Sequence, residues 1–373
     1  MSHSDKVRNE DVDIWDAFDE AVEHAEKHLK QAWENYEVVQ QTDDSLSEEY
    51  ISALTNIEET IEEFDSVYEV TDAELERADR ACSNARFLAS VTQAYREYHE
   101  SNIERRANVA KGWFDALTEC TKSVDSDIAA DQSSLQRQMQ ALEKLINVGK
   151  YGQLLDSDRI ELAEIENRVR EFHQAVQDEV PTEAYIRTGL ELAGSFQNQY
   201  TDDLAELVGE GVDREAISIT EHVSGIPDLE PVASRLEEDA TTDDDAEAVG
   251  NAVDTYADVA VLTGKQRAKY ELGNSLIETI EDSPVSDGTD VEKDLRLRLN
   301  SFQLEPIENL VRRLIEGEAT TSDTEQLMRV LTKHGGSVRR TAESLDRSTE
   351  ELFEDLHDLL LQNEIADLEV RFE

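Results

Sequence analysis

Three residues with metal-binding side chains recur at helical spacing near the N-terminus. Glu20, His24 and His28 are four positions apart, so a helix would place them on one face. Imidazole and carboxylate groups in this arrangement can bind a divalent cation if a further ligand comes from elsewhere. On an acidic, solvated helix such residues are more often plain surface groups, so we predict no metal site and keep these three as candidates only.

A small basic cluster also has residue types that could carry a function. Lys265, Arg267 and Lys269 precede Tyr270 on a predicted helix, where they could contact nucleic acid or an acidic partner. Carboxylates are so abundant in this chain that we predict ion pairing within the chain instead.

The sequence lacks the local motifs of common enzyme classes. Gly264-Lys265 has neither the earlier glycine nor the following Ser or Thr of a phosphate-binding loop, and no Gly-x-Ser-x-Gly or His-Glu-x-x-His occurs. We therefore predict a protein that is not an enzyme, with no cofactor and no small-molecule substrate.

The charge balance is extreme. The chain has 87 acidic and 35 basic residues and a net charge of -52. Self-repulsion at this density opposes compaction in dilute buffer, but at about 1 M salt the Debye length falls to roughly 3 Å. This composition predicts a protein of a salt-in halophile. Mimicry of nucleic acid is the alternative explanation of the acidity.

Cysteine content and hydropathy favour the cytoplasm. Cys82 and Cys120 are too few for a disulfide framework, which suits a reducing compartment. The N-terminal residues lack the apolar core of a signal peptide, and no run of about 18 apolar residues predicts a membrane span. We expect a cytoplasmic protein.

Periodic apolar residues and few turn formers predict an all-α fold, since the chain has only 15 Gly and 5 Pro. The expected helices cover about 7–41, a segment starting near Ser45, 72–124, a segment after Ser126, one around 160–176, 182–208, 213–223, 246–281 and 306–315. Ser45 with Glu48, and Thr71 with Glu74, have the pattern of helix-capping pairs.

The helix expected at 72–124 would be about 75 Å long, and a rod of that length needs a partner helix from its own chain or from another copy. Apolar spacings drift between three and four, so we predict antiparallel helical hairpins in preference to one long heptad coiled coil.

Turn-rich segments suggest how the chain divides. Pro181, the break at 225–231 and the linker 283–290 predict a long-helix region at 1–180, a second helical region at 181–282 and a C-terminal domain at 291–373.

At the start and at the end of that C-terminal domain, apolar residues alternate with polar ones as in a strand. Leu295, Leu297 and Leu299 have period two, as do the apolar residues from Leu368 to Phe372. Two short strands could pair there, and a helix through 291–302 is the competing prediction.

Residues 322–373 contain a defined module. Leu327, Val330 and Leu331 have helical spacing, Gly335-Gly336 ends that helix, and Asp346 lies at a turn before a third helix that Ser348 can cap. The run from Leu331 to Leu356 resembles a Fis-type helix-turn-helix, and with the two strands the domain would resemble a winged helix. The resemblance implies DNA binding.

Six residues of this module are the tentative contacts to DNA or to a protein partner: Lys333, Arg339, Arg340, Arg347, Ser348 and Thr349. The segment 293–347 has about as many basic as acidic residues, which favours DNA contact. The helix expected in the major groove is acidic, which favours a protein partner.

The sequence therefore predicts a non-enzymatic scaffold protein of long helices, which forms homo-oligomers or binds another helical protein, with the C-terminal module as a second docking surface. The alternative is a dimeric transcription regulator that binds DNA through that module.

Overall fold

A computed structural model describes residues 3–40, 48–68, 70–122, 129–147, 162–217, 226–281 and 289–319. These residues form ten α-helices and one short 3-10 helix, with no strand among them, so the described part of the chain is all-α as predicted. No helix in these ranges is long and apolar enough to cross a membrane.

The helices are α1 (His3–Gln40), α2 (Glu48–Phe64), α3 (Asp72–Lys122), α4 (Ala129–Asn147), α5 (Leu162–Glu179), α6 (Thr182–Gly209), η2 (Arg214–Ala216), α8 (Glu230–Glu237), α9 (Asp243–Glu281), α10 (Thr289–Asn300) and α11 (Glu305–Ala319). Most begin and end within a few residues of the predicted positions. At the start of α3 the Glu74 backbone N–H donates to Thr71 Oγ1 at 3.3 Å, which is half of the predicted capping box.

Two segments differ from the predicted helices. A helix was expected at 213–223. In the described part of that range, residues 213–217, the chain forms the 3-10 turn η2, which Asp213 caps through its side chain, and residues 218–223 lie outside the described residues. Residues 226–229 lead into α8, a helix the sequence analysis missed because Pro231 looked like a break. Proline is tolerated in a first helical turn, where its missing N–H has no partner to lose.

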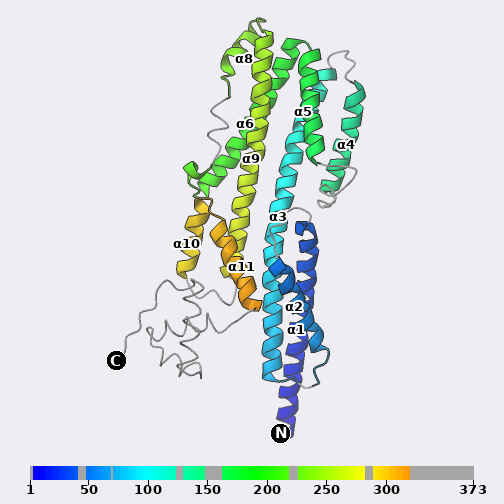
Figure 1. Ribbon diagram of the computed structural model, residues 1–373, viewed down its shortest axis with the longest axis vertical. Coiled ribbons are helices and arrows are strands. Elements are labelled where there is room, and N and C mark those ends of the chain that lie inside the picture. The colour runs from blue at the N-terminus through cyan, green and yellow to red at the C-terminus, as the bar shows by residue number, and fades with distance from the viewer. Residues whose placement is uncertain are drawn as a thin grey trace, which may run out of the picture. The chain divides into compact units, whose positions relative to one another are not determined.

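Helices α1 and α2 cover the N-terminal half of α3 (Figure 1). Phe18 of α1 packs edge-on against Phe64 near the end of α2, and Tyr36 stacks on Tyr50 near its start. These two pairs show that α1 and α2 are antiparallel. Tyr50 in turn donates a 2.8 Å hydrogen bond to the Leu88 carbonyl, which ties α2 to α3.

The C-terminal half of α3 packs against α5, α6 and α9, with α4 beside α5 (Figure 1). Trp113 contacts His173 of α5 and Phe196 of α6, with ring centroids 5.2 and 5.9 Å apart. Arg106 holds Glu166 through two hydrogen bonds of 2.8 and 2.6 Å. The apolar stripe of α3 is thus covered along its length by helices of the same chain, and its 51 residues do not by themselves require a second copy.

Small residues let α6 and α9 approach closely. A Cβ at Gly189 of α6 would lie 2.3 Å from Val249 Cγ1, and one at Gly273 of α9 would lie 2.3 Å from Leu299 Cδ1. The stiff Val249 side chain cannot readily move aside, so glycine is required at 189 where α6 meets α9, whereas a side chain at 273 would force the leucine ends of the neighbouring segment to shift.

The strand predicted at Leu295, Leu297 and Leu299 is wrong, and the competing helix is confirmed as α10. Leu295 and Leu299 are buried at 5% and 1% exposure, whereas Leu297 is 67% exposed. A strand would place all three on one face, but a helix places only residues four apart together. The second predicted strand, at 368–372, lies outside the described residues.

Residues 1–311 form one compact unit and residues 312–373 a second. Within the first unit, α5 and α6 lie on either side of the expected boundary at Pro181, and both pack on α3. Helix α10, which follows the expected linker, packs on α9.

Candidate functional site

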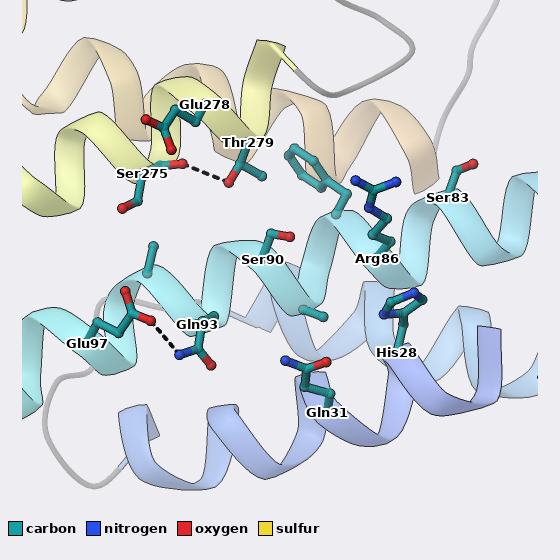
Figure 2. A pocket seen from close by; sticks show the side chains of 13 residues that line it. His28, Gln31, Ser83, Arg86, Ser90, Gln93, Glu97, Ser275, Glu278 and Thr279 are labelled. Atoms are coloured by element: carbon teal, nitrogen blue, oxygen red, sulfur yellow. Dashed lines mark hydrogen bonds between the residues drawn. The ribbon is translucent and has the colours of Figure 1, made fainter. Parts of the chain in front are cut away.

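An open groove lies between α3 and α9, with α1 along one side (Figure 2). It has a volume of about 420 Å³ and adjoins a second cavity of about 250 Å³ farther along the same two helices. We call the first of these the α3–α9 groove. Ten of its 13 lining residues have polar side chains, although apolar atoms make up the larger part of the lining surface: His28, Gln31, Ser83, Arg86, Phe87, Ala89, Ser90, Gln93, Ala94, Glu97, Ser275, Glu278 and Thr279.

The groove exists because α3 carries a polar stripe on the face toward α9. Ser83, Arg86, Ser90, Gln93 and Glu97 follow one another at intervals of three and four residues, which aligns them on one helix face. The short serine side chains do not fill the space between the helices, as leucine at the same positions would. This spacing is the signal that the sequence analysis missed.

The opposite wall is the last part of α9. Ser275, Glu278 and Thr279 line it, and Thr279 donates a 2.8 Å hydrogen bond to the carbonyl of Ser275 (Figure 2). This hydrogen bond holds the Thr279 side chain in place. The wall therefore consists of polar side chains on a long, packed helix.

Charges are separated along the groove. Arg86 and His28 lie together at one end, and Glu97 and Glu278 lie toward the other (Figure 2). Glu97 accepts a 2.6 Å hydrogen bond from Gln93, which orients its carboxylate. The groove thus presents cationic or proton-donating groups at one end, hydroxyls and amides in the middle, and carboxylates at the other end.

Burial lowers the pKa of His28, and the nearby positive charges of Arg86, Lys27 and His24 lower it further. The neutral imidazole is therefore favoured near neutral pH, and it can donate or accept a hydrogen bond in the groove.

Comparison with protein-family models, with curated proteins and with solved structures finds no match to this chain.

The metal candidates do not form a binding group. Glu20 and His24 are exposed on α1, and His28 faces the groove beside a cation. Among the described residues, no three His, Cys, Asp or Glu side chains are placed so that they could hold a metal ion.

The basic cluster on α9 pairs within the chain, as predicted, at least through Arg267. Its guanidinium lies 2.7 Å from Glu206, 3.0 Å from Glu271 and 3.5 Å from Asp203. Tyr270 donates to the Glu210 carbonyl at 3.3 Å. These contacts fasten α9 to α6.

One buried pair has the chemistry of a proton relay. Tyr185 Oη and His173 Nε2 are 2.7 Å apart, and His173 Nδ1 lies 3.5 Å from Asp254. Both rings are buried, at 1% and 4% exposure, and burial raises the pKa of Tyr185. Their packing against Trp113 makes this cluster part of the core between α3, α5 and α6.

The predicted contacts of the C-terminal module, Lys333, Arg339, Arg340, Arg347, Ser348 and Thr349, lie outside the described residues. They remain predictions from the sequence.

Proposed function

We propose that this chain is a non-enzymatic interaction protein of a halophile, which docks a protein partner in the α3–α9 groove and carries a second docking module at 322–373. The observation that supports this most directly is an open polar groove between helices whose apolar faces are already covered. Such a groove offers hydrogen-bonding groups in fixed positions, which lowers the entropic cost of binding.

The surface of the described residues supports a polar mode of docking. Large apolar side chains are exposed only at scattered positions there: Ile51, Tyr68, Val208 and Leu297. An obligate oligomer interface is typically more apolar than that. We therefore propose that the partner binds in the groove and that the described helices do not mediate homo-oligomerisation.

Photo-crosslinking tests the docking function. A photoreactive amino acid is placed at Gln31 or at Gln93, both in the groove, and at Glu237 on α8 as the control position. Cells are irradiated in high-salt medium. We expect the same protein to be crosslinked from both groove positions, not from Glu237, and to be lost when Ser90→Trp fills the groove. Crosslinking that is equal at all three positions would contradict the proposal.

The charge balance of residues 293–347 favours a second candidate, a DNA-binding regulator. This segment has about ten basic and about nine acidic residues, in a chain whose net charge is -52. Light scattering coupled to size exclusion in about 2 M KCl, with and without mixed DNA fragments, separates the two functions. Co-elution with DNA would favour the regulator if the double substitution Arg339→Glu with Arg340→Glu abolishes it. A chain that does not co-elute with DNA would rule the regulator out.

A further inference from the structure

The charged groups of the α3–α9 groove are too far apart for one small ligand. Arg86 and Glu97 are eleven positions apart on α3, which corresponds to about 16 Å along the helix axis. An amino acid or another small zwitterion cannot reach both ends. An extended polypeptide advances about 3.3 Å per residue, so about five residues cover this distance.

The middle of the groove suits a polypeptide backbone. Ser90 of α3 and Ser275 of α9 line one side of the groove, and Gln93 of α3 lies with Gln31 of α1 on the other, so hydroxyl and amide groups lie along both sides (Figure 2). These side chains can both donate and accept hydrogen bonds. The N–H and C=O groups of a bound extended segment need such partners when they leave water.

The acidic end argues against a nucleic acid strand. Glu97 and Glu278 lie where a phosphate of such a strand would have to pass, and like charges in contact are unfavourable. A peptide avoids this conflict because its side chains can differ in charge from one end to the other.

Resting on the docking function proposed above, we propose that the α3–α9 groove binds an extended peptide segment of about five residues, with an acidic side chain at Arg86 and His28 and a basic side chain at Glu97 and Glu278. The polar residues between the two charged ends bind to the walls of α3 and α9.

Blocked pentapeptides with three polar residues between two charged ones test this proposal. Four peptides are compared, which differ in their two end residues: Asp and Lys, Asp and Asp, Lys and Lys, or two uncharged residues. Each is titrated into the ¹⁵N-labelled full-length protein in about 2 M KCl, and binding is followed through the side-chain amides of Gln31 and Gln93. We expect the Asp and Lys peptide to bind about two- to fivefold more tightly than each of the others, as for single exposed ion pairs.

Charge reversal in the protein should change this preference in a defined way. Arg86→Glu should make the two-Lys peptide the best ligand, and Glu97→Lys with Glu278→Lys should favour the two-Asp peptide. Arg80→Glu is the control, because Arg80 lies on α3 outside the groove and pairs with Glu76. Circular dichroism checks that each variant is folded.

A charge preference that Arg86→Glu leaves unchanged would overturn the proposal, as would an uncharged peptide that binds equally well. Inorganic phosphate that produces the same shifts, without any effect of the Glu97 and Glu278 changes, would identify a simple anion site instead. If a partner crosslinks from the groove but no pentapeptide shows a charge preference, the extended-peptide ligand is refuted and the docking function is not.

Discussion

Arg105 of α3 lies directly against Gly264 of α9, where a Cβ would come within 2.5 Å of Arg105 Cγ. Because no side chain is present at Gly264, Arg105 Nε donates to the Ala260 carbonyl at 3.0 Å, and its other end pairs with Asp203 of α6. One arginine therefore joins α3, α6 and α9.

Gly264→Ala should destabilise the protein although alanine favours helices. The added methyl group displaces Arg105 from two of its partners, which costs about 3 kcal/mol of stability. The higher helix propensity of alanine offsets about 1 kcal/mol of this loss. Gly112→Ala is the matched control, since nothing lies within 4 Å of that Cβ on α3, and it should stabilise by about 1 kcal/mol. Urea unfolding at constant KCl measures both. Equal gains from the two substitutions would show that Arg105 is not held at Gly264.

The ion pair of Arg105 with Asp203 should behave as a buried pair. Asp203 is 7% exposed, and burial raises the pKa of its carboxyl despite the opposing charges of Arg105 and Arg267. Arg105→Met alone leaves this carboxylate with poorer partners, and we expect a loss of about 3 kcal/mol. Arg105→Met with Asp203→Leu should recover most of that loss.

Arg80→Met, which breaks an exposed pair with Glu76, serves as the control for that cycle and should change the stability by less than about 0.5 kcal/mol. The free energy of unfolding of each variant is compared in the same salt. If the double variant is no more stable than Arg105→Met, the desolvation argument fails.

The two leucines of α10 with opposite exposure should respond differently to truncation. Leu299 is 1% exposed and packs where Gly273 leaves room on α9, so Leu299→Ala should cost about 2 to 4 kcal/mol. Leu297 is 67% exposed, and Leu297→Ala should change stability by less than about 0.5 kcal/mol. Equal costs, measured by urea unfolding, would instead indicate the period-two arrangement of a strand.

Asp245 links the start of α9 to α8, and it should contribute stability that acid removes. Its carboxylate accepts hydrogen bonds of 3.0 and 3.1 Å from Arg235 Nε, and chiefly this contact lowers the pKa of Asp245 to about 2. The folded-state pKa lies below the value of about 3.9 for an unfolded aspartate. The contribution is therefore fully present above about pH 4 and is lost as the pH falls toward 2.

Comparing wild type with Arg235→Gln isolates this effect from the other carboxylates. We expect the wild type to be the more stable at pH 6 and the difference to shrink below about pH 4. Urea unfolding across pH 2 to 6 in constant KCl, scored as the difference between the two proteins, is the measurement. A difference that is independent of pH would show that the pair does not hold Asp245 ionised.

Salt should stabilise this protein strongly. The net charge of -52 produces self-repulsion that is screened over about 10 Å at 0.1 M salt and over about 3 Å at 1 M. We expect the thermal midpoint to rise steadily between 0.1 and 2 M KCl, and a neutral osmolyte at equal osmolality to produce a smaller rise. A midpoint that does not depend on salt would remove the argument for a halophilic origin.

The helices could be predicted from the sequence because their signals are local. Apolar residues repeat every three or four positions along α1, α3 and α9, and Thr71 with Glu74 marks the start of α3. Local patterns failed where they were ambiguous. Three alternating leucines fit a strand or a helix equally well, and burial against α9 selected the helix.

Only the tertiary structure decided which helix faces meet. Helices α1 and α3 are parallel, since Phe18 and Ala78 share one buried cluster and, farther along both helices, Arg96 donates a 3.1 Å hydrogen bond to Asn35. No spacing rule connects these residues. The polar stripe of Ser90 and Gln93 reads as an ordinary solvated face, and it becomes a groove only because α9 returns beside α3. Helix formation depends on neighbours along the chain, whereas the groove depends on packing between segments almost two hundred residues apart.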